Sequence, residues 1–176
     1  YQPAGLWTEL TGGSDYKADS GDALYRRSVY TFWKRTSPPP MMTNFDAPTR
    51  EACVVRMART NTPLQSLNLM NDVTYLEASR KIAERMMHEG GASPAERISF
   101  AMRLVTAQPP SEEASEILLG SYNYYRDLFS SDPDAALEYL AQGESPRDEQ
   151  LNPSALAAYS TIASLILNLD TAVTKE

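Results

Sequence analysis

The stretch NPSALAAYSTIASLILNL, residues 152–169, decides the fold of this chain of 176 residues. Asn152 and Pro153 have the form of an N-cap followed by a first-turn proline. The residues from Ala155 to Leu169 are uncharged and apolar on almost every side of a helix, but the run is shorter than the ~20 residues that a membrane-spanning helix requires. The stretch therefore predicts a helix in the middle of a helical bundle, and no membrane span.

Capping signals predict further helices before this stretch. Thr62-Pro63-Leu64-Gln65 combines an N-cap, a first-turn proline and a glutamine suited to a capping box, so a helix should begin at Pro63. Other helix starts are predicted at Asp72, Ser93, Ser111 and Asp132. Breaks are predicted at Gly90-Gly91, at Pro109-Pro110 and in a polar linker over 143–151. On the helix after Ser111, the predicted apolar stripe is Ala114, Ile117, Leu118, Tyr125, Leu128 and Phe129.

These signals predict an all-α chain, in which an irregular N-terminal arm precedes a bundle of five or more helices around a central apolar C-terminal helix. Residues 1–60 form a loop-rich arm with a basic, aromatic segment, and the pattern over 24–36 favours a helix over a strand. The prolines after Ser37 are expected to form a rigid connector. The arm should pack on the bundle of residues 61–176 as one folded unit.

Charge is unevenly distributed along the chain, whose net charge is −7. Residues 24–60 hold seven basic and two acidic residues, a net +5, whereas residues from 61 onward hold eight basic and seventeen acidic residues, a net −9. Two interpretations remain open: the basic segment packs against acidic helices, or it forms a local surface for an anionic ligand. The acidic total and the absence of a recognisable module argue against nucleic-acid binding.

The chain has one cysteine and one histidine. Cys53 alone excludes an internal disulfide, and the pair Cys53 and His88 argues against a zinc site. No Cys-x-x-Cys-His motif is present, so no haem is expected in this fragment. Cys53 lies in an apolar run and is predicted to be a small buried hydrophobe, and His88 is predicted to cap a helix or to be solvated.

Asp46 and Asp72 are the first carboxylates to consider for acid–base chemistry. They can act as an acid and base pair only within one cavity. Each also has a structural alternative, because Asp46 can bond the backbone of the Phe45–Pro48 turn and Asp72 can cap a helix. No metal-binding residues are predicted, and the sequence leaves open both calcium binding by carboxylates alone and whether the protein is an enzyme.

The anionic-ligand hypothesis rests on basic and aromatic side chains, with Tyr30 or Trp33 stacking on a sugar ring. Its basic candidates are Arg26, Arg27, Lys34, Arg35, Arg50 and Arg56. A polar set follows, made of Asn61, Gln65, Asn68 and Asn71. These amides are interpreted either as a ligand-facing row or as a buried hydrogen-bond network that locks the basic segment onto the bundle.

Short motifs spread over nearly the whole chain support a family assignment. They are Pro3-Ala4-Gly5-Leu6-Trp7, YRRSVYTFWKR at 25–35, Pro38-Pro39-Pro40, Phe45-Asp46-Ala47-Pro48-x-Arg50-Glu51-x-Cys53, Thr60-Asn61-Thr62-Pro63-Leu64-Gln65, Asn71-Asp72, Glu77-Ala78-x-Arg80 and Leu167-Asn168-Leu169-Asp170. In this combination they resemble a planctomycete-specific domain, the domain of unknown function 1553. Val73 and Met57 depart from the family pattern, which often has proline and arginine at these positions.

The resemblance implies a context. Such domains form the C-terminal part of large exported proteins that also carry a planctomycete-type cytochrome c domain, a second domain of unknown function and sometimes carbohydrate-binding modules. The chain, which begins at Tyr1 without a signal peptide, is therefore expected to be a piece of a protein exported to the periplasm or cell envelope, with any haem in a separate domain.

Two functional hypotheses follow. In the first, the chain is a non-catalytic helical module that docks on other domains of its own protein. In the second, it contributes to a binding or catalytic site for an anionic or sulfated polysaccharide.

Overall fold

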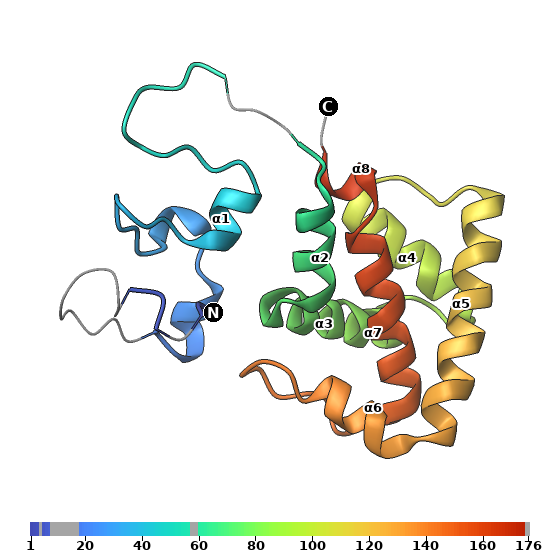
Figure 1. Ribbon diagram of the computed structural model, residues 1–176. Coiled ribbons are helices and arrows are strands. Elements are labelled where there is room, and N and C mark those ends of the chain that lie inside the picture. The colour runs from blue at the N-terminus through green and yellow to red at the C-terminus, as the bar shows by residue number, and fades with distance from the viewer. Residues whose placement is uncertain (4, 8–17, 57–59, 175–176) are drawn as a thin grey trace. The chain divides into compact units, whose positions relative to one another are not determined.

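The computed structural model describes residues 1–3, 5–7, 18–56 and 60–174 (Figure 1). Within these residues the regular secondary structure is helical, and the only β-type pairing is an isolated bridge between Lys34 and Ser37. The all-α prediction is confirmed. The chain divides into two compact units, Tyr1–Gln65 and Ser66–Glu176.

The helices of the second unit begin at the predicted caps, except for α8, which was not predicted. They are α2 (Pro63–Asn71, which starts in the first unit), α3 (Val73–Glu89), α4 (Pro94–Thr106), α5 (Glu112–Ser131), α6 (Pro133–Leu140), α7 (Pro153–Leu167) and α8 (Asp170–Val173). The side chains of Asp72, Ser93, Ser111, Asp132 and Asn152 each accept a hydrogen bond from a backbone N–H group in the first turn that follows. These caps satisfy donors that a helix start otherwise leaves unpaired.

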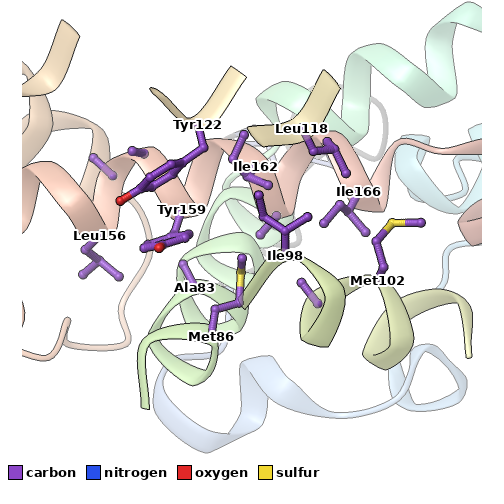
Figure 2. Packing of buried hydrophobic residues seen from close by; sticks show 14 of the residues in the cluster. Ala83, Met86, Ile98, Met102, Leu118, Tyr122, Leu156, Tyr159, Ile162 and Ile166 are labelled. Atoms are coloured by element: carbon purple, nitrogen blue, oxygen red, sulfur yellow. The ribbon is translucent and has the colours of Figure 1, made fainter. Parts of the chain in front are cut away.

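Helix α7 is the central helix, as predicted. It contacts α3, α4, α5 and α6, and these neighbours explain why it is apolar on nearly every side. Its fully buried residues are Leu156, Ala157, Ala158, Tyr159, Ile162, Ala163 and Ile166. In Figure 2, side chains from the surrounding helices point toward Tyr159, Ile162 and Ile166. No helix in the described part of the chain has both the length and the apolar character needed to cross a bilayer.

Helix α3 buries charged residues whose burial was not predicted from the sequence. Glu77, Arg80 and Glu84 are at most 9% exposed. The guanidinium group of Arg80 donates to the backbone carbonyl groups of Leu140 and Ser145, and Glu84 Oε1 accepts from the backbone N–H of Asp148 at 3.1 Å. The segment 143–151, predicted to be a polar linker, is therefore held in place by buried charged side chains.

Gly143 belongs to the same arrangement. Its φ of +89° is one that L side chains rarely adopt, and a Cβ atom there would lie 1.8 Å from Glu77 Oε2. The backbone thus passes against the Glu77 carboxylate in a way that only glycine allows. Nearby, His88 Nε2 lies 2.8 Å from Asp148 Oδ2, so this half-exposed histidine pairs with the segment instead of capping α3.

The predicted stripe on α5 is only partly correct. Leu118 is buried and Tyr125 and Phe129 pack against the core, but Ile117 and Leu128 are 61% and 45% exposed. Tyr122, which the predicted stripe omitted, is buried in their place. Helix α5 presents the side that contains Leu118 and Tyr122 to α7, so the two exposed residues lie outside the core.

In the first unit, the predicted helix over 24–36 is wrong. Two short 3-10 helices, η1 (Gly21–Tyr25) and η2 (Ser28–Tyr30), are separated by the extended residues Arg26 and Arg27. Neither has a side-chain cap, and bulky aromatic and β-branched residues lower the helix propensity of the segment. The third proline of the run is not a connector, because Pro40 begins the short helix α1 (Pro40–Asn44).

Shortening a buried side chain of α7 tests the central role of this helix. We expect Ile162→Ala to lower the free energy of unfolding by about 2–5 kcal/mol, because Ile162 is fully buried and the substitution leaves a cavity. Urea unfolding followed by circular dichroism measures the change. The matched control is Ile117→Ala on the outer side of α5, which should change the free energy by less than about 0.5 kcal/mol. Equal losses in the two variants would contradict the assignment of α7 as the core.

Alkaline unfolding tests how the stacked pair Tyr122 and Tyr159 contributes to stability. The two ring centroids lie 4.4 Å apart. Burial, and then the hydrogen bond to Tyr159, raises the pKa of Tyr122 from 10.0 to about 12. A pKa raised by folding contributes stability that is complete below the unfolded-state pKa and is lost as pH rises through the folded-state pKa. We therefore expect stability to fall between about pH 10 and 12, and Tyr122→Phe to remove part of this pH dependence. An unchanged alkaline profile in Tyr122→Phe argues against this contribution.

Candidate functional site

The first unit is organised around a buried tryptophan. Trp7 is 1% exposed, and its indole Nε1 donates to the backbone carbonyl of Ser37 at 2.8 Å. Its ring meets Phe32 edge to face, with centroids 5.0 Å apart. These contacts attach the end of the basic, aromatic segment to the N-terminal residues.

The segment before Phe32 leaves large side chains exposed. Neither η1 nor η2 has a buried residue. We name the exposed side chains the aromatic surface; they are Tyr25, Val29, Tyr30 and Phe32, with exposed fractions of 47% to 65%. The Arg26 guanidinium carbon lies 6.0 Å from the Tyr30 ring centroid, at the outer limit of a cation–π contact. Adjacent exposed apolar side chains of this kind are typical of a binding surface.

A pocket of about 280 Å³ lies beside the aromatic surface. Arg26, Tyr30 and Phe32 contribute to its wall, together with Gln2, Asp19 and Thr31. The pocket thus combines aromatic rings with a cation, a carboxylate, an amide and a hydroxyl group. Such a wall can stack against the ring of a small polar ligand and form hydrogen bonds with its substituents.

The other basic candidates do not line this pocket. The Arg50 guanidinium carbon lies 4.7 Å from the Trp33 ring centroid, and Arg50 has a positive φ of 64°. Arg35 Nε lies 3.3 Å from Glu51 Oε1, in an exposed pair. Arg27 and Arg56 are exposed and Lys34 is partly exposed. Arg26 is therefore the basic candidate that the structure brings to the pocket wall.

Asp46 forms part of a hydrogen-bonded cluster at the start of α2. Its carboxylate accepts from the backbone N–H of Thr60 at 2.7 Å and from the Thr60 hydroxyl group at 2.8 Å. Its φ of +58° is a conformation that aspartate tolerates better than most residues. The carboxylate is thus used to hold the loop backbone.

Gln65 completes the cluster. It is 2% exposed, and its amide nitrogen donates to the backbone carbonyl of Asn44 at 2.8 Å and to the Thr60 hydroxyl group at 3.2 Å. Its Oε1 accepts from the backbone N–H of Thr62 at 2.9 Å, while the Thr62 hydroxyl accepts from the backbone N–H of Gln65 at 3.3 Å. This reciprocal pair is the predicted capping box. Gln65 is thus a buried network residue that joins Asn44 and Thr60 of the segment 24–60 to the first turn of α2.

The remaining candidates of the polar set lie on α2 or at its ends. Asn61 and Asn71 are exposed, Asn68 is partly exposed, and Asn71 donates to the backbone carbonyl of Leu67 on its own helix. Asp72 belongs to the second unit, where its side chain accepts from the backbone N–H of Thr74 at 2.8 Å and caps α3.

Cys53 is exposed, so the prediction of a buried cysteine is wrong. Residues 51–56 form only bends and irregular backbone, and all six are exposed. Among the residues that the structure describes, no group of three or more histidine, cysteine, aspartate and glutamate side chains is placed to hold a metal ion.

The family model of PSD1, protein of unknown function (DUF1553), matches residues 1–122. The chain belongs to the PSD1 family. This finding confirms the resemblance drawn from the motifs. No curated protein and no solved structure matches the chain. The region shared with the PSD1 family contains the aromatic surface, its pocket and the cluster around Gln65.

Several residues of the aromatic surface and its pocket were not predicted from the sequence. Val29 and Phe32 were outside the candidate set, as were Gln2 and Asp19 of the pocket wall. The segment 24–36 was predicted to be a single helix, whereas in the structure Val29 lies in η2, Phe32 follows it, and both side chains are exposed. The missing cap and the run of aromatic and β-branched residues were the available signals against that helix.

Removal of the Gln65 amide tests the cluster. We expect Gln65→Ala to destabilise the first unit by about 1–3 kcal/mol, because partly buried backbone groups of Asn44 and Thr62 lose their partner. Hydrogen exchange at the amides of Thr60 and Thr62 measures the effect locally. Asn71→Ala, which removes an exposed amide bonded to its own helix, is the control and should leave this exchange unchanged. Unchanged exchange in Gln65→Ala rules out the proposed role.

Proposed function

We propose that this chain is a non-catalytic docking module of a larger exported protein, and that its aromatic surface binds another domain of that protein. The observation that carries the proposal is the exposure of Tyr25, Val29, Tyr30 and Phe32 side by side in sequence, at 47% to 65%. Aromatic side chains are enriched at the centres of protein interfaces, where they lose water on binding.

The charges around the aromatic surface favour an acidic partner. Arg26 and Arg27 are exposed within it, and residues 24–60 carry a net +5. Arginine is also common among residues that dominate binding energy at interfaces. A neighbouring domain with an apolar patch bordered by carboxylates would complement this surface.

The two candidate catalytic carboxylates support the non-catalytic proposal. Asp46 accepts hydrogen bonds from Thr60, and Asp72 accepts one from the first turn of α3. Both carboxylates thus stabilise local backbone. In the proposed context, the parent protein is exported to the periplasm or cell envelope, and any haem belongs to a separate domain.

A second candidate function is the binding of an acidic or sulfated saccharide in the pocket. One observation favours it: Arg26 lies on the same pocket wall as Tyr30 and Phe32, with Gln2 and Thr31 supplying polar groups. A guanidinium group binds sulfate or carboxylate, and an aromatic ring stacks on a sugar.

Binding between this chain and the remainder of its parent protein, supplied as a separate chain, tests the docking proposal. We expect Tyr30→Ser combined with Val29→Ser to weaken this binding at least tenfold in isothermal titration calorimetry. Val55→Ser changes an apolar side chain of the same unit that is fully exposed but lies outside the aromatic surface, and should have little effect. Equal affinity for the double variant and the unaltered chain would refute docking through this surface.

A thermal-shift titration with sulfated and acidic oligosaccharides, compared with neutral ones, distinguishes the second candidate. If the pocket binds such sugars, the shift saturates, weakens with added salt and is lost in Arg26→Gln. Absence of a shift in a folded sample would exclude the saccharide site and leave docking unaffected.

A further inference from the structure

The outer side of α5 carries an apolar stripe that no helix of the second unit covers. Ile117, Tyr124 and Leu128 are exposed by 61%, 64% and 45%. Their spacings of seven and four residues place them on one side of a helix. The side that packs in the core contains Leu118 and Tyr122, so the stripe has no role in the unit's own core.

Gly120 lies on the same side of α5, between Ile117 and Tyr124. A Cβ atom at Gly120 would meet nothing within 4 Å, and its φ is not positive. Neither intramolecular packing nor backbone conformation therefore requires glycine here, although glycine is unfavourable in a helix. A glycine does allow another backbone to approach closely.

Acidic residues flank this stripe. Glu113 and Glu116 are exposed, and their helical positions place them along the edge that also contains Gly120. The only basic residue of α5 is Arg126, which pairs with Asp127 and whose guanidinium carbon lies 5.9 Å from the ring of Tyr122, on the other side of the helix. The edge of the stripe is therefore negative and not neutralised by a basic residue of its own helix.

We infer that the outer side of α5 binds an amphipathic helix whose apolar side chains are bordered by lysine or arginine. The stripe runs straight for about three turns, which suits a helix laid along it. Basic flanks complement Glu113 and Glu116, and Gly120 gives the bound helix room to approach. A second copy of the chain, packed antiparallel, would bring acidic edge against acidic edge. The surface lies in the second unit, so this inference is independent of the proposed docking surface.

Two synthetic peptides test the inference. Both are amphipathic helices with leucine at spacings of three and four; one has lysine at the flanking positions and the other has glutamate. We expect the lysine peptide to bind in a saturable manner, at least tenfold more tightly than the glutamate peptide, when fluorescence anisotropy is measured with the full chain. Binding should fall at least tenfold in Tyr124→Ser and remain unchanged in Leu104→Ser, which alters an exposed leucine of α4.

Gly120→Ala separates binding from folding. The new methyl group has free space in the isolated chain, so the melting temperature should rise. The same methyl group should weaken lysine-peptide binding at least fivefold, since it occupies the space for the partner. The inference is overturned if both peptides bind equally, if neither binds, if Gly120→Ala binds as tightly as the unaltered chain, or if the stripe instead mediates self-association that Tyr124→Ser abolishes.

Discussion

The burial of α7 is the constraint on which the second unit depends. A helix with Leu156, Ile162 and Ile166 fully buried and no charged residue between them is stable only when other helices surround it. Helices α3, α4, α5 and α6 all contact it, so each has one side committed to the core. Their outer sides, including that of α5, do not pack against α7 and can bind other molecules.

The second unit also contains buried charged residues on α3, which are stabilised by hydrogen bonds and not by apolar packing. The buried charged groups of Arg80 and Glu84 on α3 bond to the backbone at the end of α6 and in the segment after it. The backbone of Gly143 in this segment lies against the buried Glu77 carboxylate. Removal of one such partner leaves an unsatisfied buried group, which costs more than an ordinary hydrogen bond contributes. This segment leads directly to Asn152, the N-cap of α7, so the buried charged residues hold in place the chain that enters the central helix.

Capping residues predicted most of the helix starts from local sequence. The side of a helix that packs in the core could not be predicted in the same way. The caps at Asp72 and Ser93 depend only on residues within one turn, and both form as predicted. Helix α5 has apolar residues over more than half of its circumference, so its sequence cannot say whether Ile117 or Tyr122 faces α7. The exposed aromatic surface was missed for another reason, because a single helix was predicted where two short 3-10 helices form, although Arg26 and Tyr30 were identified as candidates.

The cluster around Gln65 affects how much stability is lost when residues are inserted into the chain before α2. Asp46 and Thr60 are hydrogen-bonded to each other in this cluster, so these bonds hold together the two ends of the loop between them. The entropy of loop closure grows only slowly with length, by about 0.6 kcal/mol for each doubling. Val55 is fully exposed in this loop. Additional residues next to Val55 therefore cost little stability, and a reporter group inserted there would leave both ends of the loop attached.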